Sequence, residues 1–95
     1  MTQPAKANDP FTVTVGSASG LHARPAALFS KAAAEAGVPV LISKPGGDPV
    51  DAASLLSVMA LGAGHGDEVV LASPDEAAGD MLDRLAELLM TDLDA

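Results

Sequence analysis

The sequence predicts an α+β protein in which a four-stranded antiparallel sheet carries three helices on one face. Two observations lead to this prediction: short apolar segments separated by Gly- and Pro-rich turns, and two longer segments with apolar residues at helical spacing. The resulting element order, β-α-β-β-α-β-α, suits one antiparallel sheet covered by helices. Ninety-five residues make a single domain. We assign residues 11–95 to it, and residues 1–10, with two prolines and no periodicity, to a flexible N-terminal tail.

The first half of the domain begins with a half-buried strand at Phe11–Val15, where apolar and polar residues alternate. Residues 16–20 are small and predict a loop. A helix is expected from about Ala23 to Ala36, and Gly37 is typical of a helix end. The residues that we expect on its buried stripe are Leu28, Phe29, Ala32, Ala33 and Ala36.

A hairpin and a short helix follow. Residues 38–43 predict a strand with Pro39 tolerated near its start, and the turn at 45–49 leads into a strand at 50–53. A short helix is expected from Ser54 or Leu55 to Leu61, with Ser54 as its cap, before the glycine-rich turn at 62–66.

The last strand and helix complete the domain. Residues 68–72 predict the strand. Ser73 as cap, Pro74 at the first helical position and Glu76 at the third form a capping box for the final helix. Its apolar stripe is expected to comprise Met81, Leu82, Leu85, Leu88 and Leu89.

The segment Gly20–Ala27, with the sequence GLHARPAA, predicts an anion site. Pro25 lacks an N–H and has a helical φ, so a helix should start at Ala23 or Arg24 with His22 at its cap. Three backbone N–H groups are then expected to lack intrahelical acceptors, those of Ala23, Arg24 and Ala26. They lie at the positive end of the helix dipole, and the guanidinium of Arg24 can bind phosphate in two places.

An imidazole in such a site can carry a phosphoryl group. A neutral ring nitrogen attacks phosphorus, and the N–H groups and Arg24 stabilise the dianion that forms. We therefore predict His22 as the phosphoryl acceptor and Arg24 as the phosphate clamp. The surroundings of the phosphate are expected to include Ser19, Ala23 and Pro25. The other nucleophiles considered lack this combination of features: Ser17, Ser19, Ser54 and His65.

Composition excludes several classes of protein. A net charge of −8 argues against binding to nucleic acid, and two aromatic residues provide no stacking platform for bases. The chain has no cysteine, no secretory signal and no apolar run long enough to span a membrane, so we expect a cytoplasmic location without membrane insertion. Most of the acidic residues follow Gly66 and are expected on solvated helix faces.

Other chemistries find little support. Ala18 stands where a nucleophile elbow needs serine, and residues 62–66 lack the third glycine of a dinucleotide-binding loop. His22 and His65 are the only imidazoles and belong to no metal-binding motif. We therefore predict neither a metal site nor a cofactor.

Two segments resemble the HPr family, the histidine-containing phosphocarriers of the bacterial sugar phosphotransferase system. Gly20–Phe29 is similar to the active-site signature of that family, and Ala52–Gly62 is similar to its regulatory-serine helix. The resemblance extends over about residues 11–93. It implies an open-faced β-sandwich and a monomeric carrier, not an enzyme. Such a carrier accepts phosphate from Enzyme I on Nδ1 of His22 and passes it to sugar-specific Enzyme IIA proteins.

The resemblance also implies a regulatory site at Ser54, which a dedicated serine kinase and phosphorylase modifies in some relatives. Partner proteins are expected to dock on residues from both helices: Ala27, Lys31, Leu55, Leu56 and Met59. One departure concerns charge. Ser57 stands where some relatives carry lysine, which leaves Arg24 and Lys31 as the basic residues near the site and makes docking depend more on apolar contact.

Two alternatives stay open at this level. The carrier could belong to a related branch, either nitrogen-linked or dependent on a dihydroxyacetone kinase. Alternatively, the chain could be a regulatory binding protein that acts through Ser54 without phosphoryl transfer. The presence of His22 favours a carrier, because the known regulatory relatives replace this histidine.

Overall fold

The computed structural model of the chain describes residues 10–93, so the predicted tail lies outside the described part except for Pro10. Within this part the elements follow the predicted order, with one additional 3-10 turn. They are β1 (Phe11–Thr14), α1 (Ala23–Ala34), β2 (Leu41–Ser43), β3 (Val50–Asp51), α2 (Leu55–Ala60), β4 (Glu68–Ala72), η1 (Glu76–Ala78) and α3 (Gly79–Met90).

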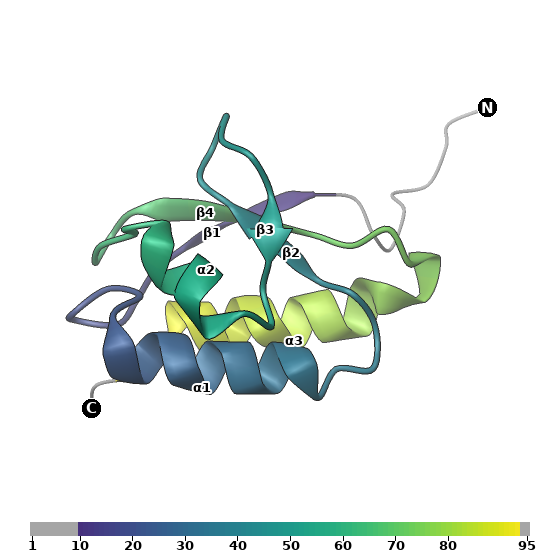
Figure 1. Cartoon of the computed structure of the whole chain (residues 1–95), viewed down its shortest axis with the longest axis horizontal. Coiled ribbons are helices and arrows are strands. Elements are labelled where there is room, and N and C mark those ends of the chain that lie inside the picture. Colours follow the sequence, from purple (N-terminus) through teal and green to yellow (C-terminus); the bar gives the residue numbers. More distant parts are fainter. Residues whose placement is uncertain (1–9, 94–95) are drawn as a thin grey trace.

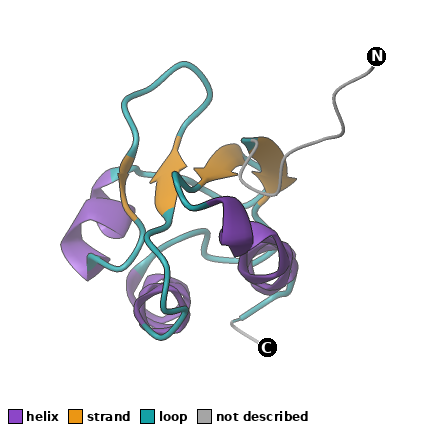
Figure 2. Cartoon of the chain, turned by 90° about the vertical axis from the view of Figure 1, so that its right-hand side faces the viewer, coloured by secondary structure: helices purple, strands orange, loops and turns teal. Residues whose placement is uncertain are grey.

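The four strands form one antiparallel sheet in the order β1-β4-β2-β3. Leu71 of the inner strand β4 lies opposite Phe11 of β1 on one side and Ile42 of β2 on the other. The helices α1, α2 and α3 lie on the same face of the sheet (Figures 1 and 2). The predicted α+β open-faced sandwich is therefore confirmed.

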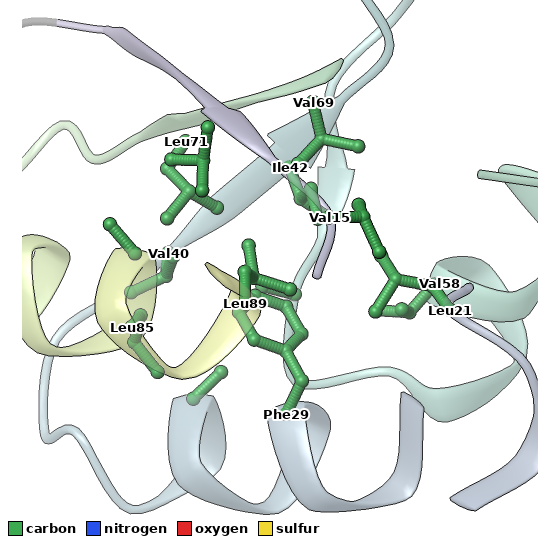
Figure 3. Close-up of a cluster of buried hydrophobic side chains, with 14 of the residues drawn as sticks. Val15, Leu21, Phe29, Val40, Ile42, Val58, Val69, Leu71, Leu85 and Leu89 are labelled. Atoms are coloured by element: carbon green, nitrogen blue, oxygen red, sulfur yellow. The ribbon is translucent and has the colours of Figure 1, made fainter. Parts of the chain in front are cut away.

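The core lies between the sheet and the helices. Phe29 of α1 is completely buried and extends toward Leu89 of α3, while Val69 and Ile42 approach from the sheet (Figure 3). Burying one such large apolar side chain contributes roughly 1.5–3 kcal/mol. The alternation predicted for β1 is present, since Val13 is buried between two exposed threonines.

The predicted apolar stripe of α1 is wrong at Leu28, whose side chain is 41% exposed. The helix buries a face displaced from the prediction, which includes Pro25, Ala26, Phe29, Ser30 and Ala33. This displacement turns Leu28 outward, onto the same exposed face as Arg24 and Lys31, because residues at a spacing of three or four share one face of a helix.

Three strands are shorter than predicted, and β1 ends at Thr14 in place of Val15. β2 starts at Leu41, after Pro39, which has no N–H to contribute to a ladder. β3 ends at Asp51 because the carboxylate of this residue accepts a hydrogen bond from the Ala53 N–H at 2.9 Å, and its carbonyl accepts one from Ser54. These bonds turn the chain from β3 directly into α2.

The predicted capping box at Ser73 is also wrong. The Ser73 hydroxyl donates to the Pro39 carbonyl and accepts from the Asp75 N–H, and it caps no helix. The side chain of Asp75 is the cap, accepting from the Ala77 N–H at 2.8 Å at the start of η1. Tertiary pairing with Pro39 thus takes Ser73 away from the role that its sequence context favours. Within residues 10–93 no helix is both long and apolar enough to cross a membrane.

Candidate functional site

His22 is the N-cap residue of α1, as predicted. Its backbone is extended, with φ −95° and ψ −166°, and its exposed side chain makes no capping hydrogen bond. The imidazole is therefore held at the start of the helix by the backbone while its ring nitrogens are accessible to a partner. Figure 1 shows this start of α1 at the end of the molecule to which the loop after β1 leads.

The predicted set of open N–H groups needs one correction. The Ala26 N–H donates to the His22 carbonyl at 2.8 Å and closes the first turn of the helix. Ala23 and Arg24 precede this first bond, and no acceptor within residues 10–93 pairs with their N–H groups. The helix start thus presents two donors near His22, with Pro25 supplying none.

Arg24 is exposed, and no carboxylate in the described part of the chain forms an ion pair with it. A guanidinium without an internal partner is available for an external anion. Together with the two open N–H groups and the dipole of α1, it makes the surroundings of His22 suited to a dianionic phosphoryl group.

The structure places the other predicted residues around this point. Ser19 and Ala23 are exposed, whereas Pro25 is buried and anchors the first turn. Ala27 and Lys31 lie on the exposed face of α1 that begins at Arg24, and Leu28 extends this face as a residue that periodicity missed.

Helix α2 packs against α1 and carries the remaining predicted residues. Ser54 caps it as predicted, accepting from the Ser57 N–H at 3.3 Å. Leu56 is 80% exposed and Leu55 is 39% exposed. Met59 instead packs against the core and is only partly accessible.

The loop that leads to His22 is tightly packed against a second loop. Gly20 has φ +74°, and a Cβ built there would lie 2.6 Å from the Ala63 carbonyl oxygen and 2.6 Å from the Gly64 Cα. The Leu21 N–H also donates to the Ala63 carbonyl, at 2.8 Å. This contact brings His65 beside the loop, a proximity that its place in a glycine-rich turn did not indicate.

The site is open surface. One hollow is lined by residues including Lys44 and Asp67, and another lies between the end of α1 and β2. His22 lines neither of them. No three His, Cys, Asp or Glu side chains within residues 10–93 are grouped to hold a metal ion. An accessible imidazole of this kind is suited to exchanging a group with another protein's active site.

The fold and the site together define a small α+β protein that presents one histidine at the start of a helix. Comparison with known proteins agrees with this description. The sequence model of a family described as "PTS HPr component phosphorylation site" matches residues 10–91. The chain belongs to this HPr family of phosphotransferase-system phosphocarriers.

Individual relatives extend over nearly the same length. The chain is 55% identical over 82 residues to the phosphocarrier protein HPr of Streptomyces coelicolor, covering 86% of this chain and 88% of that protein. It is 41% identical to HPr of Haloferax volcanii, covering 84% of this chain and 91% of that protein. The crystal structure of HPr from Bacillus anthracis superposes with a TM-score of 0.78 at 32% identity, covering 85% of this chain and 95% of that one.

The packing at Gly20 generates a prediction about stability. Gly20→Ala should destabilise the protein more than Gly37→Ala, although both glycines have positive φ, +74° and +77°. A Cβ at position 37 has no neighbour within 4 Å, so Gly37→Ala should cost only the left-handed backbone penalty, about 1–2 kcal/mol. The clash at position 20 should add about 1–3 kcal/mol. Urea unfolding measures both, and equal losses would contradict the close approach of the two loops.

Proposed function

We propose that this chain accepts a phosphoryl group from Enzyme I on His22 and passes it to Enzyme IIA proteins of sugar uptake. The observation that carries the proposal is the exposed imidazole at the cap of α1, beside two N–H groups and the guanidinium of Arg24, for which residues 10–93 provide no partner. The membership in the HPr family supports the same role. The carrier would act as a monomer in the cytoplasm, where phosphoenolpyruvate supplies Enzyme I.

The transfer needs few groups. A lone pair on the His22 ring attacks phosphorus while the bond from phosphorus to the donor breaks, and the other ring nitrogen keeps its proton. The N–H groups of Ala23 and Arg24 and the Arg24 guanidinium stabilise the charge on the phosphoryl oxygens, which is the main contribution a protein makes to such transfers. By resemblance to the family, the attacking nitrogen is Nδ1.

The phosphorus–nitrogen bond explains why a histidine suits a carrier. A phosphoramidate is a high-energy linkage, so the group can move onward to an acceptor, whereas a serine phosphate would end the transfer. The chain therefore acts stoichiometrically, alternating between free and phosphorylated His22, and it is not an enzyme with its own substrate and product.

Partner proteins dock, in this proposal, on the exposed faces of α1 and α2. Leu56 is the most exposed large apolar side chain of the described residues, and Leu55 and Leu28 are also open. Such exposed apolar side chains beside a reactive group are typical of a protein–protein contact. The contribution of Met59 is smaller than its sequence position suggested, because it is half-buried against the core.

Ser54 is proposed as a regulatory site at the edge of this docking face. Its hydroxyl is only partly accessible and caps α2. A phosphate here would place negative charge next to Leu55 and Leu56 and would have to be desolvated on docking. Modification by a serine kinase would therefore weaken docking with no change in the fold.

The first functional prediction concerns the site of phosphorylation. Incubation with Enzyme I and phosphoenolpyruvate should add one phosphoryl group, which mild acid removes and base does not. The added mass should be absent from His22→Ala and present at completion in His65→Ala, because only His22 has the open donors beside it. A label that resists acid, or one that persists without His22, would exclude the phosphohistidine carrier.

The second prediction concerns the phosphate clamp. Arg24→Ala should slow phosphoryl transfer in both directions by about 100-fold, because the charge on the phosphoryl oxygens loses its cationic partner. Arg24→Lys should recover part of the rate, since an ammonium lacks the planar two-point geometry. Arg84→Ala, which removes an exposed guanidinium from α3, is the matched control and should transfer at the normal rate. Quench-flow kinetics measures the transfer rates, and equal rates for Arg24→Ala and Arg84→Ala would show that Arg24 does not contribute to the site.

The third prediction concerns docking. Ser54→Asp should weaken binding and phosphorylation by Enzyme I, with little change in stability, because aspartate is as good an N-cap as serine. Ala77→Asp adds the same charge at an exposed residue of η1 and should leave binding unchanged. Calorimetric titration with Enzyme I distinguishes the two variants, and equal affinities would place the interface elsewhere.

A further inference from the structure

The loop between β1 and His22 is held by residues from distant parts of the chain. At its start, the Gly16 N–H donates to the Leu89 carbonyl at 2.8 Å, at the end of α3. The fit there is close, since a Cβ on Gly16 would lie 1.9 Å from the Met90 carbonyl oxygen. At its other end, the Leu21 N–H donates to the Ala63 carbonyl. Both ends of the loop are thus fixed against other elements.

Ser17 connects these supports. Its side chain is 1% exposed, and its hydroxyl donates to the Thr91 carbonyl at 3.3 Å and accepts from the Leu93 N–H at 3.0 Å. Its carbonyl accepts from the Gly20 N–H at 2.9 Å and lies 3.2 Å from Nδ1 of His65. One buried residue therefore joins the C-terminal segment 91–93, the loop itself and the loop that carries His65.

Packing alone does not require a serine at position 17. A buried hydroxyl is unfavourable unless both its donor and its acceptor functions are used, and alanine would fill nearly the same volume without that requirement. Here the Ser17 hydroxyl uses both its donor and its acceptor function on the backbone of segment 91–93. The Asp92 carboxylate adds a bond to the neighbouring Ala18 N–H at 3.1 Å. Segment 91–93 and the loop are therefore cross-linked at adjacent positions.

We propose that Ser17 is a positioning residue for phosphoryl transfer at His22. The proposal rests on the proposed function of His22 as the acceptor. Ser17 acts through the backbone. Because its hydroxyl is bonded to segment 91–93 and its carbonyl is bonded to His65, the loop holds Gly20 and Leu21 in one conformation. This conformation fixes where the His22 ring stands relative to the open N–H groups of α1.

The physical requirement is alignment. An attacking nitrogen must meet phosphorus in line with the breaking bond, and a misplacement of about 1 Å can cost up to 100-fold in rate. An exposed ring with no hydrogen bond to its own helix depends on its backbone for this alignment. Loosening the loop at Ser17 should therefore slow transfer without removing any group that touches the phosphate.

The test compares two buried serines with equivalent chemistry. Ser73 is 4% exposed, and its hydroxyl also donates to one backbone carbonyl and accepts from one backbone N–H. It lies between β4 and η1, and Figure 1 shows the η1 turn at the opposite end of the molecule from the start of α1. Ser17→Ala and Ser73→Ala should lower the Tm by similar amounts. Only Ser17→Ala should slow the initial rate of phosphorylation by Enzyme I, on the order of 10-fold. It should also broaden or shift the ¹⁵N resonances of the His22 ring.

A second pair of variants tests the same proposal at an exposed residue, where folding is not at risk. His65→Ala should slow transfer by a smaller factor. His65→Asn should restore it, because the asparagine Nδ2 is the same number of bonds from the backbone as the Nδ1 of histidine and is always a donor. If Ser17→Ala fails to fold, the transfer rates of His65→Ala and His65→Asn decide whether the hydrogen bond to the Ser17 carbonyl positions the loop.

The outcomes separate the two proposals. If wild-type protein takes up no acid-labile phosphate, the proposed function fails. If wild-type protein is phosphorylated and Ser17→Ala reacts as fast as Ser73→Ala, the proposed function stands and the positioning role of Ser17 is overturned. Equal rates for His65→Ala and His65→Asn would overturn the part assigned to the Ser17 carbonyl.

Discussion

The packing of α1 against the sheet is the constraint on which the candidate site depends. Phe29 is completely buried between the sheet and the helices, and Pro25 buries the first turn of the helix. Because the body of α1 is fixed, its start is fixed as well, and His22 and Arg24 are held at the surface, where the His22 side chain makes no capping bond and no carboxylate of residues 10–93 pairs with Arg24. The burial of one face of the helix thus positions groups that must stay exposed on the other.

The same geometry supports the proposed dependence of phosphoryl transfer on partner proteins. His22 lies on open surface, so the site alone excludes little water. In the proposed transfer, a second protein would enclose the site when it docks. The exposed leucines of α1 and α2 form the proposed docking face. The negative net charge of the chain would make apolar contact there more important than charge attraction for an acidic partner.

Loops contribute more to the site than their composition suggests. Residues 16–20 and 62–66 consist mostly of small residues, which are commonly mobile. Here their backbones approach closely at Gly20, and the end of α3 and segment 91–93 fasten the first loop from the other side. Small side chains serve the close approach of backbones in this case, and the result is a well-defined support for His22.

The sequence by itself determined the fold class, the element order, the cap position of His22 and the cap of α2 at Ser54, because local spacing and capping chemistry act within a few residues. Tertiary structure decided what depends on distant partners. The Ser73 hydroxyl bonds to the Pro39 carbonyl and does not form the predicted capping box. Leu28 is exposed because α1 buries a different face from the predicted one. The hydroxyl of Ser17 bonds to residues 74 and 76 positions further along the chain. No local pattern encodes such bonds, since each depends on where a remote backbone group comes to lie.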